Sequence, residues 1–296
     1  MTPGPKGGTS APPILTNAAP LLGRYTVLFC DVWGVIHDGV RAYPAATDAL
    51  LRFRSRGGVV ILVTNAPVPI HRVEAMLEAR HVPPEAYDGI VSSGEIALAH
   101  LRKEKYANVY FIGPRQRDAA FFEKAGAMDV SLEKAEAVVC TGLNDDVNET
   151  VESYRDVLSQ ARARDLPFVC ANPDLVVDVG GRLFLCAGAL ADAYAHMGGE
   201  VFWAGKPHAS AYDAARAMAE GIRGAKIDTS EILVVGDAVR TDLAGARGAG
   251  LDALFIAGGI HRHETMTGHA LAPEKLGTLF PGDGPPAIAA MAALAW

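Results

Sequence analysis

Short apolar runs alternate with helix-like segments along most of this chain. Two early runs rich in β-branched residues, TVLFC (26–30) and VVILV (59–63), are typical of buried strands. Each is followed by a segment with the apolar spacing of a helix, at 45–56 and at 70–80. This alternation indicates βαβ units, and it therefore predicts a parallel sheet with helices on both faces.

The same alternation continues in two later blocks. The middle block contains three strand candidates and one helix candidate: VYFIG (109–113), AVVCTG (137–142), 148–164 and PFVCA (167–171). The last block returns to the pattern of the first, with VFWAGKP (201–207), a helix at 209–220, ILVVGD (232–237) and ALFIAGG (253–259). The simplest organisation is one core domain made of 21–82 and 186–296, with a second domain inserted at 83–185.

The first 20 residues have a different character. They are rich in Pro, Gly, Ser and Thr and lack the basic start and apolar stretch of a secretory signal, so we expect a flexible tail. The apolar runs of the chain are far shorter than the ~20 residues of a membrane helix. The four cysteines form no CxxC pair, which favours reduced, buried thiols and a cytoplasmic protein: Cys30, Cys140, Cys170 and Cys186.

Composition narrows the possible partners. Half of the residues are hydrophobic and 21% are charged, as in a folded globular protein. The 27 Lys and Arg against 34 Asp and Glu leave a net charge of −7, and no segment forms a basic patch. Nucleic acid and anionic membrane are therefore not expected partners. Without GxxxxGK[ST], GxGxxG or GxSxG, the sequence also gives no support for ATP, NAD or serine-hydrolase chemistry by those routes.

Polar residues follow directly after the predicted core strands. Asp31 follows VLFC, Thr64 and Asn65 end the VVILV run, Lys206 follows VFWAG, and Asp237 follows ILVVG. Each of them alone is an ordinary loop residue or helix cap. Ligands bind outside the carboxyl ends of the strands in an open parallel sheet, so we expect these side chains to converge on one crevice.

This set of residue types suits phosphoryl transfer. A carboxylate such as Asp31 can attack phosphorus and form an aspartyl-phosphate. Asp31 and Asp237 offer the hard oxygen ligands that Mg²⁺ prefers, and Asp242 can support them. Thr64 and the neighbouring amides can hold a phosphate oxygen, while Lys206 balances the charge of nucleophile and phosphate.

Four segments resemble, in order, motifs one to four of the haloacid dehalogenase-like (HAD) phosphohydrolase superfamily: DVWGVIHDG, VTN, GKP and GDAVRTD. The insertion between VTN and GKP contains SSGEIA, VVCTGLNDD, ANPDLVVD and GALADAY. These segments resemble the large α/β cap of the class IIA branch, which includes p-nitrophenyl phosphatase-like, pyridoxal phosphatase and phosphoglycolate phosphatase proteins. The resemblance implies a Rossmann-like, doubly wound parallel core with an inserted α/β cap domain.

The resemblance also implies roles for individual residues. Asp31 would be the nucleophile, Lys206 the charge-balancing lysine, and Asp237 a Mg²⁺ ligand in a site that Asp242 supports. The phosphate would be bound by Thr64 and Asn65 together with Lys206. A homodimer formed through the cap is compatible with this resemblance.

The first motif departs from the family pattern. That pattern is Asp-x-Asp, and its second Asp protonates the leaving oxygen and later activates water; here the position is Trp33. An indole cannot do this work, worth about 10²–10⁴-fold in rate, although the Trp33 carbonyl could still ligate Mg²⁺. His37 or Asp38 could substitute, or both could lie in a solvated loop. Trp33 could instead pack against the cap or the substrate. The residue after Asp237 is Ala238, which weakens support for the metal.

Two further groups of residues have open roles. His261, His263 and His269 follow a predicted core strand, and we expect a polar loop near the site rather than a zinc site. Asn172 and Asp174 in ANPD resemble a cap segment of class IIA proteins, and Asn-Pro-Asp is also an ordinary turn.

The function that the sequence favours is a Mg²⁺-dependent hydrolase of a small phosphorylated metabolite: a sugar, nucleotide or cofactor phosphate. The cap would close over the crevice and choose the substrate. One alternative is cleavage of a C–halogen or C–P bond on the same scaffold, because relatives with those activities also lack the second Asp. Dehalogenation needs no metal, so metal dependence separates these two interpretations. Another alternative is a protein that binds phosphate esters without turnover.

Overall fold

The computed structural model describes residues 11–268, 270–280 and 286–296. The first ten residues of the expected flexible tail lie outside these ranges. Residues 11–20 differ from that expectation, because they pack along the last core strand. Leu15 donates its backbone N–H to the carbonyl of Ala290 over 2.8 Å, and Ala18 is fully buried.

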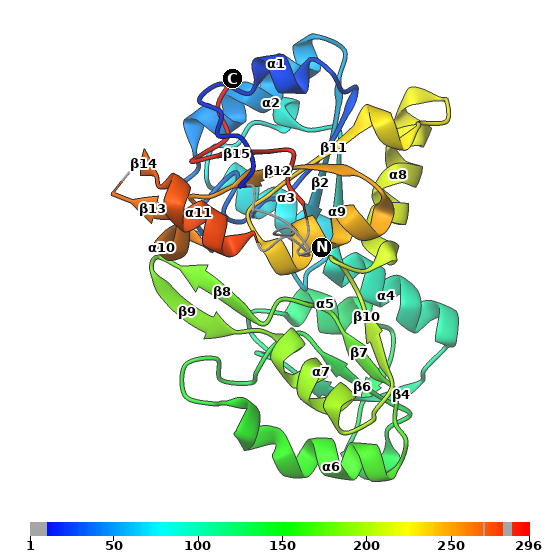
Figure 1. Cartoon of the computed structure of the whole chain (residues 1–296). Coiled ribbons are helices and arrows are strands. Elements are labelled where there is room, and N and C mark those ends of the chain that lie inside the picture. Colours follow the sequence, from blue (N-terminus) through cyan, green and yellow to red (C-terminus); the bar gives the residue numbers. More distant parts are fainter. Residues whose placement is uncertain (1–10, 269, 281–285) are drawn as a thin grey trace, which may run out of the picture.

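The core is a parallel sheet whose strand order is not the chain order (Figure 1). From one edge to the other it contains six strands: β15 (Ala289–Met291), β12 (Asp252–Ile256), β11 (Ile232–Gly236), β1 (Val27–Cys30), β2 (Val59–Thr64) and β3 (Gly89–Ser92). All neighbours in this sheet pair in parallel. The chain winds outward from β1 in both directions, which confirms the expected doubly wound α/β fold.

Helices cover both faces of the core sheet. On one face, α1 (Ala19–Leu22), α2 (Pro44–Ser55) and α3 (Ile70–Glu78) bury apolar side chains in one hydrophobic cluster with strand residues such as Leu28 and Leu62. On the other face, α8 (Ala209–Arg223), α9 (Ala244–Ala249) and α11 (Pro273–Leu279) form a second cluster with residues such as Phe29 and Ile61. Alternate residues of each strand therefore face different helices, so the strands are apolar throughout.

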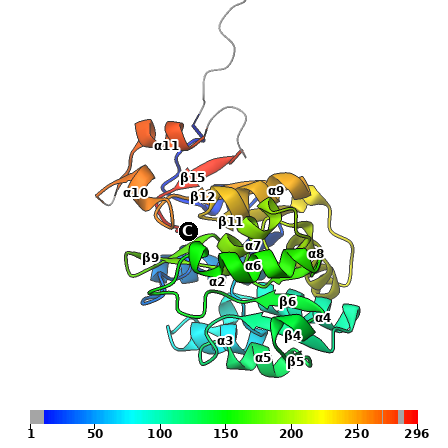
Figure 2. The same ribbon diagram turned by 90° about the horizontal axis from the view of Figure 1, so that it is seen from below.

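A second parallel sheet lies beside the core. Its order is β10 (Val201–Trp203), β7 (Phe168–Cys170), β6 (Ala137–Cys140), β4 (Asn108–Ile112) and β5 (Met128–Asp129). One face packs against α4 (Ser93–Glu104) and α5 (Ala119–Lys124), and the other against α6 (Arg155–Ala163) and α7 (Ala187–His196). Figure 2 shows this layering from below. This second unit is the cap.

Two small hairpins complete the fold. The first, β8 (Val176–Val179) with β9 (Arg182–Leu185), extends from the cap toward the core (Figure 1). The second, β13 (Met266–Thr267) with β14 (Ala270–Leu271), follows α10 (Arg262–Thr265).

The strand pairing differs from the expected domain boundaries at both ends of the insertion. Residues 89–92 pair with β2 and so belong to the core sheet, whereas 201–203 pair with β7 and belong to the cap sheet. Both sheets are parallel and covered on two faces, so both select short, apolar, β-branched strands. The amino-acid pattern of a strand therefore does not reveal which sheet it joins.

Two expectations about the whole chain can be compared with the described residues. All four cysteines are free and buried, as expected. Among the described residues, no helix combines the length and hydropathy needed to cross a membrane.

Candidate active site

The carboxyl ends of three neighbouring core strands meet on the side of the core that faces the cap. Asp31 directly follows β1, Thr64 is the last residue of β2, and Asp237 directly follows β11. Because β1 lies between β2 and β11 in the sheet, these three side chains start from adjacent strand ends. The structure thus brings together residues separated by more than 200 positions, as the sequence predicted.

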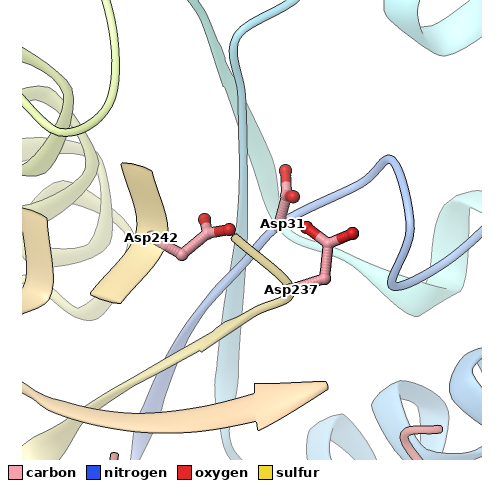
Figure 3. Close-up of side chains that lie close together, drawn as sticks. All are labelled: Asp31, Asp237 and Asp242. Atoms are coloured by element: carbon pink, nitrogen blue, oxygen red, sulfur yellow. The ribbon is translucent and has the colours of Figure 1, made fainter. Parts of the chain in front are cut away.

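Three carboxylates form a compact cluster here (Figure 3). Oxygens of Asp31, Asp237 and Asp242 lie within 4.8 Å of one another, and no other group of three or more His, Cys, Asp or Glu in the described residues is this close. All three are buried. Burial and the negative charge of Asp242 raise the pKa of Asp31 to about 7. Burial and Asp31 likewise raise the pKa of Asp237 well above its usual range, so the cluster needs cations.

Lys206 supplies one of these cations. Its Nζ lies 2.6 Å from Oδ1 of Asp31 and 2.7 Å from Oδ1 of Asp242, and the residue is only 3% exposed. Burial works against the charge of this ammonium, but Asp242 and Asp31 outweigh it and hold the pKa of Lys206 well above its usual value. The lysine is therefore a fixed positive charge beside Asp31.

Asp242 is positioned by an irregular turn. It lies on a π-helical turn, Val239–Leu243, in which the N–H of Leu243 reaches back to the carbonyl of Ala238. Oδ1 of Asp242 accepts from Lys206, and Oδ2 accepts from the N–H of Ala238 over 3.1 Å. Both oxygens thus accept hydrogen bonds, so Asp242 supports the site through Lys206, and its expected part in the metal site stays a prediction.

Asp237 occupies a gap between two glycines. A Cβ on Gly34 or on Gly259 would lie 1.9 Å from its Oδ2, so neither position can carry a side chain in this arrangement. The N–H of Ile260 donates to the same oxygen over 2.6 Å. Oδ1 of Asp31 accepts from the N–H of Val32 as well as from Lys206.

This arrangement leaves two hard oxygens for a cation. In the described part of the chain, no hydrogen bond reaches Oδ2 of Asp31 or Oδ1 of Asp237. Two neighbouring carboxylate oxygens in a repulsive cluster fit a divalent ion such as Mg²⁺. The carbonyl of Trp33 as a further ligand stays a prediction.

The side chain of Asn65 is fully engaged in hydrogen bonds that hold the Lys206 loop and the cap. Its Oδ1 accepts from the backbone N–H of Lys206 over 2.8 Å, and its Nδ2 donates to the carbonyl of Lys206 over 3.0 Å. The same Nδ2 donates to Oδ1 of Asp174, on the cap, over 2.9 Å. Thr64 and Asn65 line the same cavity as Asp31, and their expected phosphate contacts stay a prediction.

The cavity lies between core and cap and has a volume of about 490 Å³. The core wall includes Asp31, Lys206 and Asp237. The cap wall is formed largely by side chains that follow cap strands or belong to the β8–β9 hairpin: Arg117, Asp118, Thr141, Asp174, Asp178 and Phe184. The sequence interpretation missed Arg117 and Asp118, although they follow the apolar run VYFIG much as Asp31 follows VLFC.

Trp33 joins the two walls. Its indole Nε1 donates to the backbone carbonyl of Asp178 in the β8–β9 hairpin over 2.8 Å. The guanidinium of Arg262 lies 3.6 Å from the Asp178 carboxylate. Of the alternatives for Trp33, the structure therefore supports packing against the cap.

Neither candidate for a substitute acid is well placed. His37 is fully buried and does not line the cavity, and burial together with Arg80 lowers its pKa to about 4. Asp38 lines the cavity; burial acts to raise its pKa, but the backbone N–H groups of Arg41 and Val40 outweigh it and lower the pKa. An ionised carboxylate and a buried neutral imidazole are poor proton donors here.

The histidine-rich loop contributes no metal site in the described residues. Nδ1 of His261 lies 3.1 Å from a carboxylate oxygen of Glu264. The ring of His263 accepts a hydrogen bond from Nε of Arg262. His269 lies outside the described residues. Ile260 and Arg262 of this loop do line the cavity.

Comparison with known proteins identifies the family. A family model described as haloacid dehalogenase-like hydrolase matches residues 28–128, and one described as HAD-hydrolase-like matches 203–278. A haloacid dehalogenase-like hydrolase from Brucella suis 1330 is 41% identical, with a TM-score of 0.84, over 95% of this chain and 100% of its own. The chain therefore belongs to the haloacid dehalogenase-like hydrolases.

More distant relatives carry specific names. The ribonucleotide monophosphatase NagD of Escherichia coli is 28% identical over 79% of this chain and 88% of its own length. The 5′-nucleotidase YutF of Bacillus subtilis is 25% identical over 82% of this chain and 91% of its own. The solved structure of E. coli NagD shares the fold with a TM-score of 0.63 at 21% identity, over 92% of this chain and 97% of that one. The core with its inserted α/β cap is the architecture of the class IIA branch.

Proposed function

We propose that this hydrolase is a Mg²⁺-dependent phosphatase of small phosphorylated metabolites that works through an aspartyl-phosphate on Asp31. The observation that carries the proposal is the buried group of Asp31, Asp237, Asp242 and Lys206 at the strand ends. It combines a nucleophile, oxygen ligands for a divalent ion and a fixed positive charge in one cavity. The relatives named as phosphatases support the same activity.

In this mechanism the carboxylate of Asp31 attacks phosphorus. Lys206 holds Oδ1 and so fixes the orientation of the carboxylate. A bound Mg²⁺ would supply charge neutralisation and orientation of the phosphate. Asp242 keeps Lys206 in place and charged, while Thr64 at the end of β2 binds a phosphate oxygen.

The substrate contacts both walls of the cavity. Its phosphate lies against the core residues, and its remaining part lies against the cap wall, including Arg117 and Phe184. Two named relatives act on nucleotides, so nucleoside monophosphates come first among the candidate substrates, before sugar and cofactor phosphates. The four free, buried cysteines support a cytoplasmic location.

The test is phosphate release from p-nitrophenyl phosphate and from a panel of nucleotide, sugar and cofactor phosphates, each with Mg²⁺ and with EDTA. Mg²⁺-dependent turnover that is absent in Asp31→Asn supports the proposal. A folded, metal-binding protein that releases no phosphate from any member of the panel contradicts it.

A further inference from the structure

Trp33 occupies the position that provides the general acid in this family, and its indole donates a hydrogen bond to Asp178 of the cap. A phosphate ester of an alcohol still needs a proton on its leaving oxygen, because an alkoxide leaves poorly. If the proposed phosphatase acts on such esters, another group must hold that proton. The candidates are the carboxyl groups in the described part of the cavity wall.

Most carboxylates in the cavity are unsuited. Asp118 and Asp146 both pair with Arg117, at 2.9 Å each, and Asp178 lies near Arg262 and accepts from the N–H of Gly181. A nearby cation or donor stabilises the ionised form. The backbone N–H groups of Arg41 and Val40 stabilise the ionised form of Asp38.

Asp174 differs from these carboxylates. It lies in the cap segment ANPD, lines the cavity together with Asp31 and Lys206, and has no ion-pair partner among the described residues. Its Oδ1 accepts from Asn65, whereas no hydrogen bond in the described part of the chain reaches its Oδ2. Burial raises the pKa of this carboxyl despite the hydrogen bond from Asn65.

The local backbone holds Asp174 firmly. Its N–H donates to Oδ1 of Asn172 over 3.1 Å, which makes a tight turn. A Cβ on Gly188 would lie 2.4 Å from the carbonyl of Asp174, and one on Gly205 would lie 3.2 Å from Pro173. The turn is thus fitted between a cap helix and the strand-end loop that carries Lys206.

We propose that Asp174 is the general acid and base that replaces the missing carboxylate of the first motif, a role that rests on the proposed function. Asn65 donates both to Asp174 and to the backbone carbonyl of Lys206, so this carboxyl lies at the end of the cavity where the proposed phosphate site is. A bound phosphate dianion favours the protonated form further, because a second negative charge nearby opposes ionisation.

Asp31 forms a bond to phosphorus while the phosphorus–oxygen bond of the ester breaks, and the electron pair stays on the leaving oxygen. That oxygen takes the proton of the Asp174 carboxyl. Water then attacks phosphorus and gives one proton to the Asp174 carboxylate. The bond between phosphorus and the Asp31 oxygen breaks, with its electron pair on Asp31, which releases inorganic phosphate and restores the Asp31 carboxylate and the Asp174 carboxyl.

The test is Asp174→Asn, compared on two substrates. An asparagine keeps an oxygen that can accept from Asn65 but has no acidic proton. We expect kcat/KM for a sugar phosphate to fall by about 10²–10⁴-fold, the usual contribution of a general acid. For 2,4-dinitrophenyl phosphate, whose phenolate leaves without a proton, we expect a far smaller loss.

Asp178→Asn is the matched control, since Asp178 lines the same cap wall and its contact with Trp33 uses only the backbone. It should change kcat/KM for both substrates by the same factor. Equal losses for both substrates in Asp174→Asn, or no loss, would overturn the role of Asp174 as an acid. A wild-type protein that hydrolyses neither ester would instead contradict the proposed function.

The wild-type pH profile tests the role without any substitution. For the sugar phosphate, kcat/KM should fall on the alkaline side as Asp174 loses its proton, and the profile for 2,4-dinitrophenyl phosphate should lack this limb. The charged and titratable groups that face Asp174 are Lys206, Asp242 and Arg240 on the core and Cys186 on the cap. They act on both substrates alike, so two superimposable profiles would contradict the proposal.

Discussion

The two walls of the cavity are held together by different forces. On the core wall, Lys206 is paired at 2.6 and 2.7 Å with two carboxylates, and all three residues are buried. The cap wall is tied to the core by two single hydrogen bonds, from Trp33 to Asp178 and from Asn65 to Asp174. Two longer ion pairs at partly exposed residues add to them, Arg262–Asp178 at 3.6 Å and Arg240–Asp192 at 3.5 Å. Buried charges interact strongly, whereas a single hydrogen bond contributes only about 0.5–1.5 kcal/mol and an exposed ion pair about 0–1 kcal/mol.

This difference separates the nucleophile and its cation from the contacts that control access to the cavity. The core wall is an arrangement of buried charges held by short ion pairs, and its lysine comes from the loop that follows cap strand β10. The cap wall is attached by contacts weak enough to break when the substrate enters and the product leaves. Substitutions in the core wall should therefore abolish activity or stability, while substitutions that only weaken the cap contacts, and leave the Asp174 carboxyl in place, should change substrate binding.

The largest effect is expected for Asp31→Asn, which removes the nucleophile. Turnover of p-nitrophenyl phosphate with Mg²⁺ should fall by at least about 10⁴-fold, the scale on which enzymes respond to loss of a nucleophile. Asp38→Asn is the matched control, because Asp38 lines the same cavity and its oxygen only caps the backbone of Val40 and Arg41. Comparable losses in the two variants would contradict the assignment of Asp31.

The next largest effect is on stability, for Lys206→Met. It leaves Asp31 and Asp242 buried without their cation, so the free energy of unfolding should fall by about 3–5 kcal/mol in urea denaturation. Lys226→Met is the control: Lys226 pairs with Glu220 at 2.7 Å but is 92% exposed, and exposed pairs contribute about 0–1 kcal/mol. Equal losses of stability in the two variants would show that the buried ion pairs of Lys206 contribute no more to stability than an exposed pair does.

A pH-dependent effect should follow from the repulsion in the same cluster. The folded protein raises the pKa of Asp31 from 3.8 to about 7, so its contribution to stability is present at acid pH and is lost as the pH rises through that range. In EDTA, the melting temperature should therefore fall between about pH 5 and pH 8, and added Mg²⁺ should restore more of it at the higher pH.

The measurement is differential scanning fluorimetry with and without Mg²⁺ at both pH values. Asp237→Asn, which removes one of the two free ligand oxygens, should abolish most of the Mg²⁺ effect. A Mg²⁺-induced shift that is equal at both pH values, or that survives in this variant, would argue against a metal at this cluster.

The smallest effect is expected for the hydrogen bond that joins Trp33 to the cap. Trp33→Phe keeps an aromatic ring but loses the hydrogen bond to Asp178, worth about 0.5–1.5 kcal/mol, so KM should rise by up to about 10-fold with little change in kcat. Trp203→Phe is the matched control, since Trp203 stacks on His208 and does not line the cavity. A drop in kcat without a change in KM would indicate that Trp33 acts in the chemical step and not in holding the cap.

The predictions from sequence succeeded where a local pattern carries the information. A polar residue directly after an apolar strand marks the carboxyl end of that strand, and parallel pairing brings such ends to one edge. For this reason Asp31, Thr64 and Asp237 were predicted to share one site, and the structure places them there. Lys206 was predicted there on the same ground and does lie beside Asp31, but the strand before it pairs with β7 of the cap sheet and not with the core sheet. The family resemblance of the same four segments led to the same fold.

Tertiary structure alone decided how the cap meets the core. The partners of Trp33 and Asn65, the neutral burial of His37 and the sheet membership of residues 89–92 and 201–203 all depend on contacts between distant segments. Such contacts leave no periodic trace in the chain, since they join single residues of loops rather than repeated positions of one element. The sequence by itself therefore determined the reactive edge of the sheet, and the packing of the cap against it determined which side chains face the leaving group.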